Sequence, residues 1–335
     1  MAVLEVRGLT KHFEVRPGFL GRVFGHHDAH VIKAVHDVSF AIGEGEILGL
    51  AGESGCGKST TCLLITRLLE PSSGEIRFKD QPIAGLSGAE LKDFRRRVQM
   101  IFQDPYESLN PRFTVLDLIA EGPRALGLWD AKETEERSLA MLADVGLKPD
   151  EYKARYPHEM SGGERQRVGI ASALVMEPEL VVADEPLSML DVSIRAGILD
   201  LLRGLSERLG FSCLYVSHDL SILSNIADRL MVMYLGTVAE IGPVEEVIAA
   251  PRHPYTTALV EAVPAPDPRY RRPIPKIHGD IARPVDPPPG CRFAGRCPNV
   301  AEVCRSDPIP ALRTMGPAHL AACHRVEGHQ IEEVA

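Results

Sequence analysis

Residues 47–60 read ILGLAGESGCGKST, and they are the most informative part of the sequence for the fold. The apolar run 47–51 predicts a buried strand, and the apolar periodicity of 60–69 predicts a helix that ends before Pro71 and Gly74. The loop between them has the spacing of glycines, lysine and serine that holds nucleotide phosphates. Because this loop follows a strand and opens a helix, as the pattern requires, the sequence predicts an α/β nucleotide-binding fold.

Each part of the loop has a chemical reason. Glycines allow backbone N–H groups to converge on a phosphate at a helix N-terminus, where the helix dipole favours an anion. Lys58 would neutralise the β- and γ-phosphate oxygens, and the Ser59 hydroxyl would bind Mg²⁺. The alternative is a chance glycine turn, which the strand and helix on either side disfavour. The predicted phosphate-binding residues are Gly52, Glu53, Ser54, Gly55, Cys56, Gly57, Lys58, Ser59 and Thr60.

The whole chain sets broader limits. Its 335 residues exceed what one core usually holds, about 250–300 residues, so we expect one main domain and an appendage. The formal net charge of −9 disfavours bulk nucleic acid as the main partner. Glu5 and Arg7 interrupt the apolar stretch that a secretion signal needs, and no later segment offers about 18 consecutive apolar residues. We expect a soluble, cytoplasmic chain that leaves any membrane-spanning helices to other polypeptides.

Apolar patterning predicts the remaining elements. Strands are expected at 3–6, 38–42, 180–183, 212–216 and 230–234, and helices at 115–147, 163–176 and 222–227. The alternation of strands with helices indicates a mostly parallel, buried sheet, and the stretch 115–147 indicates an inserted helical subdomain. Residues 16–30 are expected to form a loop, and the proline-rich residues 251–289 an extended linker.

Two carboxylates follow the all-apolar run 180–183. Asp184 would be costly at the end of a buried strand unless it met a cation, so we expect it to hold Mg²⁺ directly or through water. Glu185 is the candidate general base for the attacking water. Either residue could instead cap a loop, but the phosphate loop upstream needs a partner of this kind.

Residues 161–164 read SGGE and open the next predicted helix. A serine followed three residues later by a glutamate is a capping box, so Ser161 and Glu164 could simply start a helix well. Gly162 and Gly163 also expose N–H groups at a helix N-terminus, which is an anion site. A second phosphate site in an ATPase suggests a nucleotide shared between subunits.

The chain resembles the nucleotide-binding domain of ABC transporters over about residues 1–250. The resemblance rests on six motifs in order: GESGCGKST, Gln103, MSGGERQRV, VVADEP, SMLD and SHD. It implies a P-loop NTPase fold with a RecA-like core, an antiparallel β-subdomain and a helical subdomain at about 104–165. It also implies two ATPase domains facing head to tail, so that Ser161, Gly162 and Gly163, with Glu164 in the same motif, contact the γ-phosphate of the partner's ATP.

The same resemblance implies roles for single residues. Gln103 would sense Mg²⁺ and the attacking water, and His218 would contact the γ-phosphate. Asp191 would line the dimer interface. Phe13 matches the aromatic residue that stacks on adenine, with ordinary core packing as the alternative.

A narrower resemblance spans nearly the whole chain. QDPYESLNPR, HPYTTALVEAVPAPDP and a four-cysteine tail are similar to the ATPase subunits of dipeptide and oligopeptide importers, especially the second of their two ATPases. Residues 251–335 would then be the C-terminal extension of that family. The resemblance implies a second, nonidentical ATPase, two permeases and an extracytoplasmic binding protein as partners. Residues 103–113 would then bind the coupling helix of the permease. The chain would lie at the cytoplasmic face of the cell membrane.

Three residues depart from the usual family pattern: Glu164 in place of glutamine, Ser172 in place of arginine and Met189 in place of alanine. Glu164 suits the helix dipole but adds negative charge near a phosphate. The composite site that this chain completes for its partner is therefore expected to be weaker.

The tail reads C-x5-C-x6-C-x18-C, with Cys291, Cys297, Cys304 and Cys323. The gaps exceed those of most structural zinc knuckles, and a proline follows Cys297, as at some iron–sulfur ligands. The family resemblance suggests a [4Fe-4S] cluster; zinc and buried unliganded thiols are the alternatives. His26, His27, Asp28 and His30 could imitate a metal site, but a solvated loop is favoured.

Several functions stay open at this stage. The leading one is the energy-coupling ATPase of a peptide importer. An importer of nickel, glutathione or another small solute would use the same mechanism. A soluble ABC ATPase acting on DNA or ribosomes would be expected to carry a coiled-coil insertion or tandem nucleotide domains. A catalytically silent subunit is disfavoured by Glu185 and His218, although Glu164 keeps it possible for the opposite site.

Overall fold

The computed structural model describes residues 2–15, 30–104, 108–263, 277–279, 285–287, 289–306, 308–325 and 329–330. The predicted loop at 16–30 lies almost wholly outside these residues. Part of the predicted linker and residues 105–107 of the stretch predicted to contact the permease also lie outside them. The chain divides into two compact units. The first comprises residues 1–3, 42–47 and 83–217, and the second comprises residues 4–41, 48–82 and 218–335.

The first unit contains a parallel sheet of β6 (Val98–Ile101), β7 (Leu180–Asp184) and β8 (Ser212–Val216), with β7 in the middle. Every residue of β7 and β8 is buried, as expected for parallel strands covered on both faces. The predictions of strands at 180–183 and 212–216 are confirmed, and β7 extends one residue further to include Asp184.

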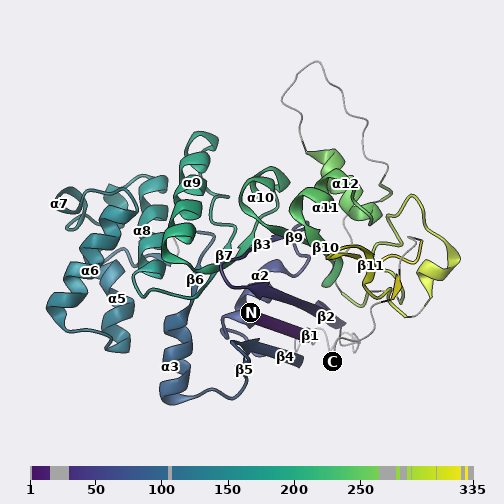
Figure 1. Cartoon of the computed structure of the whole chain (residues 1–335), viewed down its shortest axis with the longest axis horizontal. Helices are drawn as coiled ribbons and strands as arrows, with labels where there is room; N and C mark the ends of the chain where they lie inside the picture. The colour runs from purple at the N-terminus through teal and green to yellow at the C-terminus, as the bar shows by residue number, and fades with distance from the viewer. Residues whose placement is uncertain are drawn as a thin grey trace, which may run out of the picture. The chain divides into compact units, whose positions relative to one another are not determined.

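Helices make up most of the first unit. They are α3 (Gly88–Arg97), α5 (Val115–Leu126), α6 (Ala131–Asp144), α7 (Pro149–Tyr152), the 3-10 turn η1 (Pro157–Glu159), α8 (Gly162–Leu174) and α9 (Val192–Leu209). Figure 1 shows α5, α6 and α8 packed side by side. The predicted helical stretch 115–147 is two helices, because Gly127 takes the left-handed conformation that ends α5.

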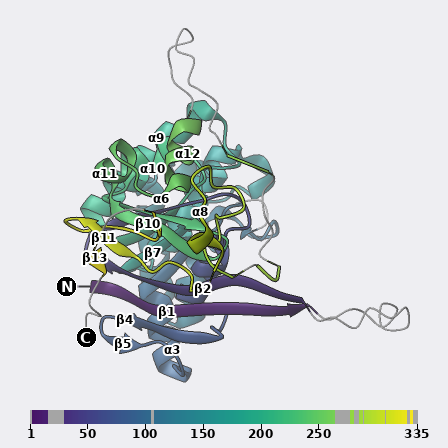
Figure 2. The same cartoon turned by 90° about the vertical axis from the view of Figure 1, so that its right-hand side faces the viewer.

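The second unit begins with an antiparallel sheet in the order β2-β1-β4-β5. Its strands are β1 (Ala2–Val15), β2 (His30–Gly43), β4 (Ser73–Phe78) and β5 (Gln81–Pro82). Figure 2 shows β1 lying beside β4. The strands predicted at 3–6 and 38–42 therefore exist, but both are parts of 14-residue strands.

A second sheet in this unit is mixed. β3 (Ile47–Ala51) pairs in parallel with β9 (Arg229–Tyr234). Antiparallel pairs then join β9 to β10 (Thr237–Pro243) and β10 to β12 (His319–Ala321). They continue from β12 to β11 (Arg313–Gly316) and from β11 to β13 (His329–Gln330). The helices are α2 (Lys58–Ile65), α10 (Leu220–Ile226), α11 (Val244–Ala249), α12 (Pro254–Ala262) and the 3-10 turn η2 (Glu302–Arg305). β3 and β9 are parallel, as expected, but β10 pairs antiparallel with β9 and the strands beyond it continue in antiparallel pairs, so the sheet of this unit is mixed.

Two predicted boundaries need correction. The helix after the phosphate loop ends at Ile65 rather than at residue 69, because Arg67 takes a positive φ of 53° and cannot continue the helix. Part of the predicted linker is the helix α12: the His253 ring accepts a hydrogen bond from the Tyr255 N–H at 3.0 Å, and Pro254 stands at the first helical position. Within the described residues, no helix is long and apolar enough to cross a membrane.

Candidate functional site

The predicted phosphate loop lies in the second unit, directly after the fully buried strand β3. Two of its glycines are required by geometry. A Cβ on Gly52 would lie 2.4 Å from the Met233 carbonyl oxygen, and one on Gly57 would lie 2.2 Å from the Ala34 carbonyl oxygen. Both glycines also have φ in the range that side chains disfavour, 154° and 107°. The loop is therefore fixed tightly against its neighbours, and its backbone conformation depends on these two glycines.

Lys58 is turned into this loop. Its side chain is buried, at 5% exposure, and its Nζ donates to the carbonyl oxygens of Gly52 at 2.8 Å and Glu53 at 3.1 Å. The ammonium group is thus enclosed at the start of α2, where the helix N-terminus also attracts anions. The next residue, Ser59, is exposed, so its hydroxyl is accessible to a ligand.

Glu53 of the loop is bound by residues that sequence reasoning missed. Its backbone N–H donates to the Tyr255 hydroxyl at 2.9 Å, and Arg296 Nη1 donates to its Oε2 at 2.7 Å. HPYTTALVEAVPAPDP is a family signature, and nothing in its pattern of residues predicts a contact with position 53. The loop cysteine Cys56 is buried, and burial raises the pKa of its thiol, so it is an unreactive packing residue.

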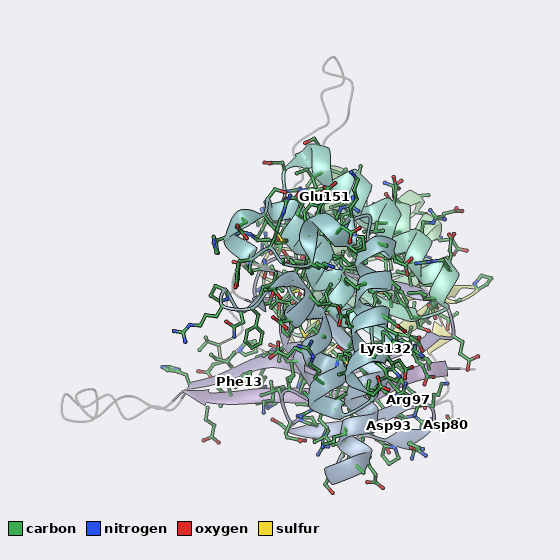
Figure 3. All side chains as sticks on the ribbon, turned by 90° about the vertical axis from the view of Figure 1, so that its left-hand side faces the viewer. Phe13, Asp80, Asp93, Arg97, Lys132 and Glu151 are labelled. Carbon is green, nitrogen blue, oxygen red and sulfur yellow. The ribbon has the colours of Figure 1, made fainter. Side chains whose placement is uncertain are left out.

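Two further predicted site residues lie in the second unit. Phe13 stands near the end of β1 with 37% exposure (Figure 3). The Lys11 ammonium lies over its ring, 5.3 Å from the centroid. His218 is exposed two residues after β8.

Of the predicted magnesium and base residues, Gln103, Asp184 and Glu185 lie in the first unit, whereas Ser59 lies in the second. Asp184 is the last residue of β7 and is 5% exposed. Glu185 follows with a positive φ of 43°, and its N–H donates to the Val216 carbonyl at 3.1 Å. The structure brings Gln103 to Glu185, with 3.5 Å between Nε2 and Oε2. These side chains therefore gather where parallel strands β6 and β7 end, the edge at which α/β proteins bind ligands.

The predicted capping box at the start of α8 is confirmed. Glu164 Oε2 accepts from the Ser161 N–H at 2.7 Å and from its hydroxyl at 2.8 Å, and the Ser161 oxygen in turn accepts from the Glu164 N–H at 3.4 Å. Tyr152 also donates its hydroxyl to Glu164. These hydrogen bonds, Tyr152 first, lower the pKa of Glu164, so its carboxylate is held in the charged form. Its charge is turned toward the start of its own helix.

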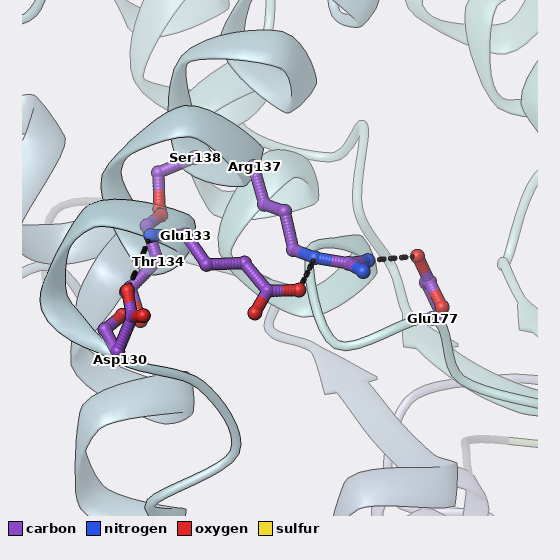
Figure 4. Close-up of polar contacts among 6 residues, drawn as sticks. All are labelled: Asp130, Glu133, Thr134, Arg137, Ser138 and Glu177. Carbon is purple, nitrogen blue, oxygen red and sulfur yellow. Dashed lines mark hydrogen bonds and ion pairs between the residues drawn. The ribbon is translucent and has the colours of Figure 1, made fainter.

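Neighbouring elements fix α8 at both ends. A Cβ on Gly163 would lie 2.8 Å from Ile194 Cγ2, so this glycine also allows α9 to pack closely. Beyond the other end, Glu177 pairs with Arg137 of α6 at 2.7 Å, and Arg137 also pairs with Glu133 at 2.9 Å (Figure 4). Asp191, the predicted interface residue, is exposed at the start of α9.

The four tail cysteines line one small cavity in the second unit, together with residues that include His253 and Phe293. All four are free thiols, and Cys297, Cys304 and Cys323 are buried. Burial, reinforced by the other thiols, raises the pKa of Cys291 to about 11 and raises that of Cys297 as well. In the part of the chain that the structure describes, no group of three or more His, Cys, Asp or Glu side chains is arranged to hold a metal ion.

Comparison with known proteins agrees with this geometry. The chain matches the ABC transporter family over residues 35–188 and the oligopeptide/dipeptide transporter C-terminal region over residues 239–304. It is 44% identical to the oligopeptide transport ATP-binding protein AppF of Bacillus subtilis over 325 residues, covering 96% of this chain and 97% of the relative. It is 42% identical to the di/tripeptide transport ATP-binding protein DppF of Pseudomonas aeruginosa, covering 97% and 98%.

A solved structure is also similar. It is a dimeric ATP-binding cassette in a post-hydrolysis state bound to ADP and Pi, with a TM-score of 0.62 and 27% identity, covering 72% of this chain and 98% of that one. The fold, the phosphate loop and these matches define an ATPase of the ABC class with a P-loop. Within that class, the chain belongs to the family of ATP-binding subunits of peptide ABC transporters.

Proposed function

We propose that this chain binds Mg²⁺–ATP at residues 52–60 and hydrolyses it to drive a peptide importer. The observation that carries the proposal is the Lys58 ammonium, enclosed by the carbonyls of Gly52 and Glu53 at the start of α2. A buried ammonium group that is hydrogen-bonded to neutral carbonyl oxygens can exchange these acceptors for charged phosphate oxygens, which bind it more strongly. The names of the relatives support peptides as the cargo.

Other residues of this chain complete the reaction in this proposal. Ser59, Asp184 and Gln103 would hold Mg²⁺, which would supply positive charge beside the transferred phosphoryl group. Glu185 accepts a proton from the attacking water, and His218 contacts the γ-phosphate. The 3.5 Å contact between Gln103 and Glu185 supports a shared water, because both side chains can then reach one molecule.

The site is proposed to form between two ATPase subunits. Ser161, Gly162 and Gly163 of this chain contact ATP held by the partner's phosphate loop, with Glu164 beside them, and Asp191 lies in the same interface. Phe13 stacks on the adenine, for which its 37% exposure leaves room. The partner is a second, nonidentical ATPase, and two permeases and an extracytoplasmic binding protein complete the transporter. The chain then lies at the cytoplasmic face of the cell membrane, as the ATPase domain 1–250 followed by the extension 251–335.

The cysteine-lined cavity is proposed to hold a [4Fe-4S] cluster in a structural role. Four thiols around one cavity supply the soft ligands that iron–sulfur clusters and zinc prefer, and the cluster requires all four as thiolates. Iron and sulfide analysis with visible absorbance of anaerobically purified protein tests this. Iron and sulfide lost together in Cys297→Ser support the cluster, whereas colourless protein with stoichiometric zinc, or with no metal, overturns it.

The function is tested with the complete transporter. The chain is copurified with its permeases, partner ATPase and binding protein, reconstituted in vesicles, and assayed for ATP-dependent uptake of labelled di- and oligopeptides. Mass spectrometry of the solute on the binding protein identifies the cargo. ATP-dependent peptide uptake that is lost in Lys58→Ala supports the proposal. Uptake of nickel, glutathione or another solute in place of peptides overturns the assignment of cargo, and ATP-independent uptake overturns the role of this chain.

A further inference from the structure

We propose that Arg296 and Tyr255, two residues of the C-terminal region, are positioning residues that hold the phosphate loop in its ATP-binding conformation. This inference rests on the proposed binding of ATP by that loop. It assigns to the C-terminal region a direct effect on nucleotide affinity, in addition to any structural role.

Both residues act on Glu53. The Tyr255 hydroxyl accepts a hydrogen bond from the Glu53 backbone N–H at 2.9 Å, and Arg296 Nη1 donates to the Glu53 carboxylate at 2.7 Å. The ion pair is well shielded, with side-chain exposures of 11% for Arg296 and 20% for Glu53. One residue of the loop is therefore held at its backbone and its side chain by two different parts of the C-terminal region.

Glu53 in turn contacts the phosphate-binding groups. Its carbonyl oxygen accepts from Lys58 Nζ at 3.1 Å and from the Cys56 N–H at 3.2 Å. A shift of the Glu53 peptide would therefore move the lysine and the turn that carries the loop's N–H groups. Binding sites of this kind lose affinity when their backbone must be ordered on binding, because that ordering costs conformational entropy.

Aromatic packing holds the two residues in place. The rings of Tyr234, Tyr255 and Phe293 lie within 4.6–5.4 Å of one another, and Tyr255 is fully buried. Arg296 lies 5.8 Å from the Tyr234 ring centroid, and its backbone N–H donates to the Phe293 carbonyl at 2.9 Å. The side chains that hold Glu53 are thus supported by a rigid cluster rather than by a solvated surface.

The site favours arginine at this position. Arg296 also approaches the Tyr234 hydroxyl at 3.4 Å from the same Nη1 that binds Glu53. A planar guanidinium can face an aromatic ring and a carboxylate together, whereas a lysine offers a single point charge. Arg296→Lys is therefore expected to restore only part of the function lost in Arg296→Ala.

The test measures ATP affinity of the full chain with a fluorescent ATP analogue, alongside KM and kcat for ATPase activity and the melting temperature. Arg296→Ala is expected to weaken ATP binding about 10-fold and to raise KM more than it lowers kcat. Tyr255→Phe, which removes only the hydroxyl, is expected to weaken binding about 3-fold to 10-fold. The matched control is Arg305→Ala, which removes an exposed arginine adjacent to Cys304 and is expected to bind ATP as the wild type does.

A double-mutant cycle separates positioning from a general loss of stability. If Arg296 acts through Glu53, the double variant Glu53→Ala/Arg296→Ala should bind ATP no more weakly than the worse single variant. Additive losses, or affinities of Arg296→Ala and Tyr255→Phe equal to that of the wild type, would overturn the inference. Should Arg296→Ala fail to fold, Arg296→Lys and Tyr255→Phe provide the same comparison. Failure of the wild type itself to bind ATP would instead refute the proposed function.

Discussion

The substitution Glu240→Gln tests how much a buried carboxylate in β10 contributes to the free energy of unfolding through its hydrogen bonds to the C-terminal region. Glu240 is fully buried, and its carboxylate accepts three hydrogen bonds. Oε1 accepts from the Arg252 N–H at 2.8 Å and is 2.7 Å from His319 Nε2; Oε2 accepts from the His253 N–H at 2.8 Å. The carboxylate therefore links β10 to β12 and to the start of α12.

The expected cost follows from this geometry. A glutamine side chain has one acceptor oxygen, so in either orientation its NH₂ group faces at least one buried donor. The orientation that costs less keeps the bonds to Arg252 and His319 and leaves the His253 N–H without an acceptor. An unsatisfied buried donor and the weakened bond to His319 together cost about 2–4 kcal/mol of unfolding free energy. The melting temperature should then fall by about 3–6 °C.

Differential scanning calorimetry of the full chain measures this effect. The matched control is Glu246→Gln, which approaches the same histidine at 3.6 Å from a side chain that is 48% exposed. The control should change the unfolding free energy by at most about 0.5 kcal/mol, because exposed pairs contribute little. Equal melting temperatures for the two variants would refute the assignment of the buried network. ATP affinity should also fall in Glu240→Gln, because α12 carries Tyr255.

Three further outcomes are expected. Glu185→Gln should retain ATP binding and lose at least about 100-fold in hydrolysis, and a wild-type rate would remove this residue from the role of base. Glu164→Gln should raise ATPase turnover of the assembled transporter about 2-fold to 5-fold by removing a negative charge near phosphate, and unchanged or lower turnover would contradict that. Gly57→Ala should abolish ATP binding in a fluorescence titration, because its Cβ would lie 2.2 Å from the Ala34 carbonyl oxygen. The control Gly204→Ala, which has open space around it, should bind ATP normally, and measurable ATP affinity in Gly57→Ala would show that the loop can adjust.

The elements that sequence patterns located well are those with local causes. The run 47–51 is a strand because five apolar residues in succession suit a strand buried on both faces, and the structure gives it the same bounds. The capping box at 161–164 was also predictable, because its hydrogen bonds join residues only three positions apart. Local patterns failed at residues 66–69, where a positive φ at Arg67 ends the helix early.

Contacts between elements determine the structure of the C-terminal region. Its prolines predict a linker, yet His253 and Pro254 start a helix there, and the Glu240 carboxylate of β10 accepts a hydrogen bond from the His253 N–H. The contact between Arg296 and Glu53 joins residues that are 243 positions apart, and no local pattern of apolar or polar residues specifies such a pair.

The class of protein and the chemistry of the phosphate loop follow from local sequence, because a strand, a glycine loop and a helix need only neighbouring residues to form. The groups that hold the loop from elsewhere in the chain are visible only in the folded structure. Lys58 lies among carbonyls whose positions depend on Glu53, and Glu53 is bound by Tyr255 and Arg296. Such contacts arise from packing of the whole unit around buried aromatic rings, so they become visible only once the chain is folded.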